Sequence, residues 1–426
     1  MSADADRIGM RHVLAGLLAA TAAGPALAQD TGRLLTFGTS FGVIADDNPD
    51  LVPDGGSGTV DPYISTDFTL LRATRIQSLA LAGSLQFRTG EDSDEGTGSS
   101  GGLAQSNLNL SYDRTSADAA LGIDAALRRD KVDYLDPLEI DLDDDLIIDE
   151  IDAIGRTGIR LVYDIDAVLE LRRRAPFGIT LSAGASSVDY SDTGNAALTD
   201  EERLRAGLGL RFDLDPLLQV NADLGFDRYR NPEDGEEDRD ETSLALSLSR
   251  SLPTGSIGLT GGFTTLDTGE RVTFALGRGL ETELWNVSAE IGATREVSGD
   301  VTPVAQIEVA RELPTGSISA SLRRSVRSDN DGEETILNAA RADFARQINP
   351  TLTMTMGLAY VGTEGTGDNE QSNRLASANL GFQKTLTEDW SLNLGLSHRA
   401  EDDGNFGRAS SNRVTLNLRR AFATTR

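Results

Sequence analysis

The sequence contains no cysteine and only two histidines. The first absence excludes a disulfide framework, a thiolate metal site and a cysteine nucleophile. His12 lies in an N-terminal segment with the features of an export signal, so a Ser-His-acid site would have to use His398. Parity places His398 on the apolar face of its strand, which favours a rim histidine that faces lipid headgroups. We therefore expect no enzymatic activity and no cofactor.

Basic residues and long apolar runs are also scarce. Lys and Arg number 39 against 68 Asp and Glu, which gives a net charge of -29 and argues against a nucleic-acid partner. No apolar run approaches the roughly 18 residues that a membrane helix needs. If the chain enters a bilayer, it must therefore do so as β-strands, and only a closed barrel then satisfies every backbone hydrogen bond.

The N-terminus predicts a secretory signal peptide over residues 1–28. Arg11 and His12 precede an apolar run over residues 13–23, and Ala26-Leu27-Ala28 forms an A-x-A cleavage pattern. Translation from Met10 instead of Met1 would leave a more compact signal. Either start predicts a mature chain over residues 29–426 that leaves the cytoplasm.

The mature chain repeats one unit of alternating apolar and polar residues followed by a turn. Leu244-Ala245-Leu246-Ser247-Leu248-Ser249 shows the alternation, and Val414-Thr415-Leu416-Asn417-Leu418 shows it again near the end. Such alternation places apolar side chains on one face of a strand and polar ones on the other. A long series of these hairpins predicts an all-β fold, a closed antiparallel transmembrane β-barrel. Aromatic residues make up only 5% of the chain, which is low for the aromatic girdles of such a barrel.

The connections between predicted strands fall into two classes that alternate. Short turns such as Pro253-Thr254-Gly255 and Pro314-Thr315-Gly316 alternate with longer acidic stretches such as residues 192–202. This pattern predicts short periplasmic turns, long acidic extracellular loops and an even count of about 20 strands, within 18–22. Arg172-Arg173-Arg174 falls at a short turn, where we expect it to face phosphates of the inner leaflet.

The polar faces predict a water-filled interior, because a dry core would leave their charges unpaired. A soluble secreted β-sandwich or β-solenoid also alternates, but it does not predict two alternating classes of connection. Six charged residues on the polar faces are our pore-lining candidates. They are Arg160, Arg205, Arg211, Asp223, Asp227 and Arg413.

The longest connection, residues 131–156, is strongly acidic and is the third outer loop by our count. In general porins the third loop folds into the barrel and narrows it. A folded-in acidic loop that faced lumen arginines would create a transverse field at a constriction. The alternative is an external loop that stays hydrated. The constriction candidates are Asp141, Asp143, Asp144, Asp145, Asp149 and Glu150.

The last predicted strand is amphipathic and ends near Phe422, four residues before the C-terminus at Arg426. This ending resembles the assembly signal of bacterial outer-membrane barrels, in which Phe is usually the final residue. Together with residues 390–396 and Asp46-Asp47-Asn48-Pro49, it resembles the porin-2-like β-barrel proteins of Gram-negative bacteria. The resemblance implies an outer-membrane location and, as partners, the barrel-assembly machinery, outer-membrane lipid and lipopolysaccharide.

The sequence thus predicts a porin-like channel for passive diffusion of small hydrophilic solutes or ions. The alternative is a non-channel barrel that serves surface exopolysaccharide export or a surface structure. The small number of residues between the predicted cleavage site and the first strand, which begins near Arg33, argues against a plugged transporter.

Overall fold

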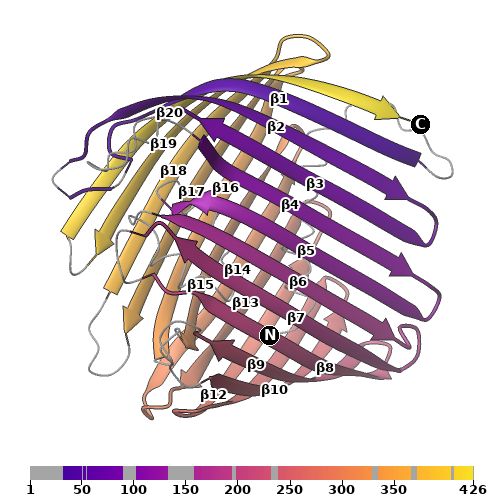
Figure 1. Cartoon of the computed structure of the whole chain (residues 1–426). Coiled ribbons are helices and arrows are strands. Elements are labelled where there is room, and N and C mark those ends of the chain that lie inside the picture. Colours follow the sequence, from indigo (N-terminus) through magenta and orange to yellow (C-terminus); the bar gives the residue numbers. More distant parts are fainter. Residues whose placement is uncertain are drawn as a thin grey trace.

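The computed structural model is a barrel of 20 antiparallel strands (Figure 1). The structure describes residues 32–49, 51–53, 55–89, 102–132, 158–193, 198–231, 238–328, 334–365, 372–403 and 407–425. Within these ranges no helix is long and apolar enough to cross a membrane. The strands are β1 (Gly32–Asp46), β2 (Thr59–Ala73), β3 (Gln77–Arg88), β4 (Gly102–Thr115), β5 (Ala119–Lys131), β6 (Ile159–Leu171), β7 (Phe177–Ser191), β8 (Glu201–Asp215), β9 (Leu218–Arg230), β10 (Arg239–Leu252), β11 (Gly255–Leu266), β12 (Gly269–Glu281), β13 (Trp285–Arg295), β14 (Val301–Leu313), β15 (Gly316–Ser328), β16 (Glu334–Asn349), β17 (Leu352–Gly365), β18 (Ser372–Thr385), β19 (Trp390–Asp403) and β20 (Gly407–Thr425).

Each strand pairs with its neighbours in sequence, and β1 pairs with β20 to close the sheet. The closing pair runs in register from Leu34 opposite Thr425 to Asp46 opposite Arg413. No strand in the barrel is left with an unpaired edge, which is what a β-structure needs in a bilayer. The predicted closed, antiparallel, 20-stranded barrel is therefore confirmed.

The two rims differ in the length of their connections, as the sequence predicted. Strands β10 and β11 are joined only by Pro253 and Thr254, and β14 and β15 only by Pro314 and Thr315. The start of β1 and the end of β20 lie at this same turn-side rim, on the right in Figure 1. The opposite, loop-side rim carries the longer connections, although β11 and β12 are joined there by just Asp267 and Thr268.

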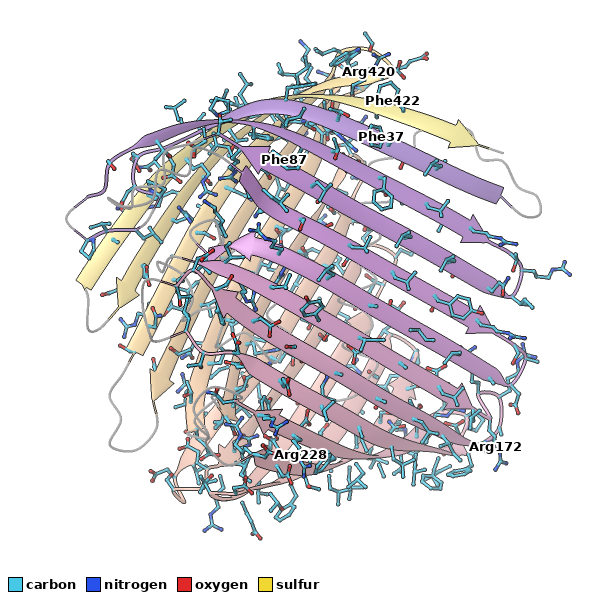
Figure 2. All side chains as sticks on the ribbon, viewed as in Figure 1. Phe37, Phe87, Arg172, Arg228, Arg420 and Phe422 are labelled. Atoms are coloured by element: carbon cyan, nitrogen blue, oxygen red, sulfur yellow. The ribbon has the colours of Figure 1, made fainter. Side chains whose placement is uncertain are left out.

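Strand parity separates an apolar outside from a polar inside. On β8 the outward residues Leu204 and Phe212 are 56% and 38% exposed, whereas Arg203 on the inner face is 7% exposed. Figure 2 shows Phe37 and Phe422 at the outer surface, where β1 meets β20. Their ring centroids lie 6.3 Å apart, so an aromatic contact spans the closing pair. The outward faces of the strands form a largely apolar band, of the kind that lipid covers.

Candidate functional site: the lumen and the seam of the barrel

The lumen contains a cavity of about 970 Å³ along the wall formed by β6 to β15. Its lining is polar and glycine-rich, with inward-facing arginines from β8, β12 and β15 and inward-facing acids from β6, β9 and β13. The charged residues on these inner faces are Arg205, Arg211, Arg271 and Arg323 against Glu170, Asp223, Asp227 and Glu290. Arg173, Arg174 and Arg324 also border the cavity, so its lining has seven arginines against four acids and does not share the strongly negative charge of the whole chain.

Four of the six pore-lining candidates border this cavity: Arg205, Arg211, Asp223 and Asp227. The other two lie on inner faces but are held elsewhere. Arg160, near the loop-side end of β6, is fully buried at 0% exposed. Arg413 is bound into the closing pair of strands, as described below.

Arg205 joins two carboxylates of the neighbouring wall. Its Nη2 lies 2.9 Å from Asp164 Oδ2 and 3.0 Å from Asp166 Oδ2, and Asp124 sits opposite Asp166 on β5. Gly184 lies between them, and a Cβ there would come within 2.2 Å of Asp166 Oδ1. Glycine therefore provides the space in which the arginine reaches the acids. Parity identified Arg205, but its partners were missed, although Tyr163-Asp164-Ile165-Asp166 alternates clearly.

A second set of lumen charges lies nearer the loop-side rim. Arg203 donates from Nε and Nη2 to Asp227 Oδ1 at 3.0 and 2.8 Å, and its guanidinium lies 4.6 Å from the centre of the Tyr229 ring. Arg271 Nη2 lies 3.4 Å from Glu241 Oε1. Arginines on one strand are thus tied to acids on another, so the field in the lumen is set by fixed pairs.

On β16, β17 and β18, inward-facing side chains near the loop-side rim are shielded from solvent. Leu337, Val361 and Leu375 are inward-facing and at most 1% exposed. The cavity along β6 to β15 reaches both ends of the strands, from Arg173 and Arg211 near the short turns to Arg271 and Val326 near the loop side. The inner wall therefore differs around the barrel: it borders an open cavity along β6 to β15, and it has buried apolar side chains near the loop-side rim of β16 to β18.

The acidic connection lies outside the described residues from residue 133 to residue 157. The six constriction candidates between Asp141 and Glu150 fall in this range, so their predicted role stays a prediction. Within the described ranges, no group of three or more potential metal ligands comes together.

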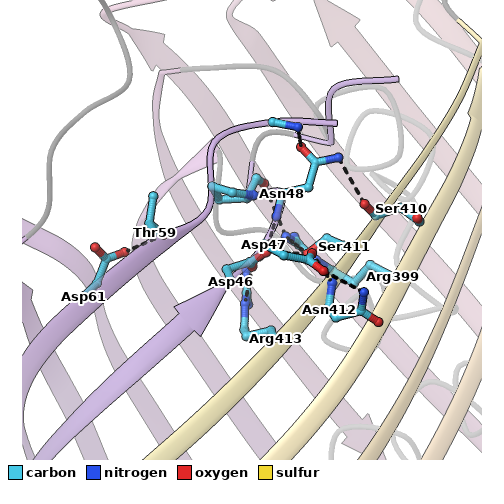
Figure 3. Close-up of polar contacts among 12 residues, drawn as sticks. Asp46, Asp47, Asn48, Thr59, Asp61, Arg399, Ser410, Ser411, Asn412 and Arg413 are labelled. Atoms are coloured by element: carbon cyan, nitrogen blue, oxygen red, sulfur yellow. Dashed lines mark hydrogen bonds and ion pairs between the residues drawn. The ribbon is translucent and has the colours of Figure 1, made fainter. Parts of the chain in front are cut away.

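The seam between β1 and β20 holds a buried charge cluster at the loop-side rim (Figure 3). The Asp46 side chain is 1% exposed, and its Oδ2 lies 2.9 Å from Arg413 Nε and 3.3 Å from Arg399 Nη2. Ser411 donates its hydroxyl to the other carboxylate oxygen of Asp46. One carboxylate therefore links β1 to both β19 and β20.

Two adjacent residues extend this seam. The Asn48 side chain donates to the carbonyl of Ser410 and accepts from the backbone N–H groups of Val52 and Gly56, all at 3.0 Å. Asp47, just beyond β1, accepts hydrogen bonds from the backbone and side-chain N–H groups of Asn412, and these bonds lower its pKa below the usual value. Beyond the family resemblance of Asp46-Asp47-Asn48-Pro49, the sequence predicts no role for this segment, and the structure shows that the side chains of Asp46, Asp47 and Asn48 hold the seam together.

The comparisons with known proteins show the fold. No protein-family model matches the chain, and a search of curated proteins finds no relative. Among solved structures, the siderophore receptor PirA from Acinetobacter baumannii has a TM-score of 0.50 at 8% identity, covering 93% of this chain and 81% of that one. A ferric enterobactin receptor mutant from Pseudomonas aeruginosa, in complex with enterobactin, has a TM-score of 0.50 at 9% identity, covering 93% and 82%. The chain thus shares the barrel architecture of outer-membrane proteins.

Proposed function

We propose that this protein is an outer-membrane channel through which small hydrophilic solutes or ions diffuse passively. The single observation that carries the proposal is the polar cavity of about 970 Å³ inside a barrel whose outer face is apolar. Charged side chains at the cavity wall keep such a space hydrated, because expelling water from them is costly. No catalytic role is assigned to any residue, including His398.

We further propose that the protein reaches the outer membrane by export across the inner membrane and then by barrel assembly. Residues 1–28 act as a cleaved signal, and the strand that ends with Phe422 is read by the barrel-assembly machinery. Phe422 is 42% exposed on the outer face, where another protein can contact it before lipid does. The folded barrel then contacts outer-membrane lipid and lipopolysaccharide, as a porin-2-like protein would.

Selectivity follows from the charges in the lumen. Since seven arginines and four acids line the cavity, the barrel itself does not favour cations. The acidic connection supplies the excess negative charge and thereby a preference for cations. Deletion of residues 141–150 should weaken the cation preference, and should also raise the conductance if the loop narrows the pore. Unchanged conductance and selectivity would contradict the constriction role.

One observation favours a second candidate, a barrel that does not conduct on its own. Leu337, Val361 and Leu375 face inward near the loop-side rim and are at most 1% exposed, so this part of the inner wall is not open to solvent. Such a barrel would serve surface exopolysaccharide export or surface structure, or would open only for a ligand. The receptors with a similar fold are named for siderophores and enterobactin, which makes ligand-dependent uptake one form of this alternative.

Solute permeation into liposomes separates the two candidates. The purified mature protein is reconstituted, and swelling rates are measured in neutral sugars of increasing size and in charged solutes of similar size. A channel gives rates that fall with solute size, whereas liposomes as tight as protein-free ones would support the non-conducting barrel. Arg205→Glu adds a specific test, because it should shift the rates towards cations relative to wild type.

A further inference from the structure

The outer face carries a ring of basic residues close to the turn-side rim. Strands with even numbers run towards this rim, and eight of the ten have an outward-facing base near that end. Seven of the eight are exposed, and Arg311 is half-buried. This set, which we call the basic girdle, consists of Arg72, Arg114, Arg250, Arg278, Arg311, Arg346, Lys384 and Arg420.

The girdle lies within the apolar band and not beyond it. Arg278 stands between the outward-facing Leu276 and Leu280, which are 53% and 37% exposed, and Arg250 stands likewise between two exposed leucines. Phe422 comes after Arg420 on the same outward face of β20 and is 42% exposed. A base with lipid-facing neighbours on both sides lies where acyl chains meet headgroups, and its long side chain reaches the phosphates.

The girdle lacks acidic partners among the residues that the structure describes. Instead, Arg311 lies 4.6 Å from the centre of the Trp285 ring, and Arg420 lies 5.4 and 4.6 Å from those of Trp390 and Phe422. Figure 2 shows Arg420 beside Phe422 on the outside of β20.

The loop-side rim provides the contrast. Three outward-facing bases there form ion pairs with acids: Arg228 lies 2.7 Å from Asp240, Arg230 lies 3.5 Å from Asp238, and Arg408 lies 3.0 Å from Asp402. Arg129 and Arg295 face outward at the same rim without such a pair among the described residues. Ion pairs thus neutralise several bases at the loop-side rim, whereas none of the eight girdle residues forms an ion pair with a described acid. Charge complementarity requires an anion from the surroundings at the turn-side rim.

We infer that the basic girdle binds anionic phospholipids of the leaflet at the turn-side rim through their headgroup phosphates. The inference rests on the membrane location under "Proposed function" but not on conduction. A zwitterionic headgroup carries its own cation and neutralises its phosphate, so a phosphatidylglycerol-type headgroup gains more from the girdle. The stacked tryptophans hold two of the arginines in place at the lipid boundary.

The two tryptophans of the sequence are built-in reporters, because each contacts a girdle arginine. The mature protein is reconstituted in phosphatidylcholine vesicles, and dibrominated phosphatidylglycerol or dibrominated phosphatidylcholine is titrated in. Both leaflets have the same composition, so the direction of insertion does not matter. Quenching of tryptophan fluorescence gives the relative binding constant of the two headgroups at the girdle.

We expect phosphatidylglycerol to be preferred by about fivefold, the effect of one basic side chain near an anionic surface. The double variant Arg311→Gln/Arg420→Gln should bring the ratio close to one. The matched control Arg228→Gln, at the loop-side rim, should leave it unchanged. If the double variant does not fold, about 1 M salt applied to wild type tests the same charge interaction, since the Debye length falls to about 3 Å.

A ratio of one in the wild-type protein would overturn the inference, and so would a preference that survives both the double variant and high salt. This failure is distinguishable from a failure of the channel proposal. A barrel without conductance that prefers phosphatidylglycerol retains the girdle, and a conducting barrel without the preference loses it.

Discussion

The seam cluster predicts that Asp46 stabilises the closed barrel far more than its neighbour Asp47 does. Asp46→Asn keeps the size of the side chain but removes the charge that faces Arg399, 2% exposed, and Arg413, 12% exposed. Arg399 and Arg413 then lose the carboxylate that both of them face. Breaking a buried ion pair on one side costs about 3–5 kcal/mol, so the free energy of unfolding should fall by that amount.

Denaturant unfolding of the barrel in vesicles, followed by tryptophan fluorescence, measures this loss, and heat-modifiable migration on gels confirms it. The matched control is Asp47→Asn, one residue further along, where the exposed carboxylate makes two hydrogen bonds to Asn412. That variant should lose less than about 1 kcal/mol. Equal losses for the two variants, or a loss under about 1 kcal/mol for Asp46→Asn, would refute the reasoning from burial.

Three further predictions concern the loop beyond β1, the lumen and the C-terminal strand. The pKa of Asp47 is lowered in the folded barrel, so its stabilising contribution is present above the unfolded pKa of about 3.9 and is lost as pH falls through the folded value. The difference in free energy of unfolding between wild type and Asp47→Asn should therefore disappear when both are unfolded at increasingly acid pH. Gly184→Ala should separate Arg205 from Asp166, lower the free energy of unfolding by about 1–3 kcal/mol and change ion selectivity in bilayer recordings. The control is Gly261→Ala, which has open space around the new methyl group and should leave selectivity unchanged. Phe422→Ala should slow assembly, measured as the yield of heat-modifiable barrel in membranes, and normal yield would argue against its role as a signal.

The fold was predictable because alternation acts on every strand. One residue of slip would turn Leu204 and Phe212 inward and Arg203 outward, so parity alone fixes the two faces. The position of the turns was also readable, since Pro314 presets the backbone of a tight turn. The two-residue turn at Asp267 and Thr268 was harder to foresee, because neither proline nor glycine lies within it.

The site was only partly predictable, because pairing across strands depends on register. Arg205 and Asp166 are 39 residues apart in sequence and meet only because β6, β7 and β8 align around Gly184. The seam depends on closure of the whole ring, which joins residues 367 apart, Asp46 and Arg413. The low content of aromatic residues argued against a barrel. In the structure, both tryptophans lie near the turn-side rim, where each contacts a girdle arginine.

Single-channel recording of the purified mature protein in planar bilayers tests the central claim most directly. The account predicts stable current steps of uniform size, with a modest cation preference that Arg205→Glu increases. Protein that inserts as a heat-modifiable barrel but produces no current steps would contradict the assignment as a passive channel.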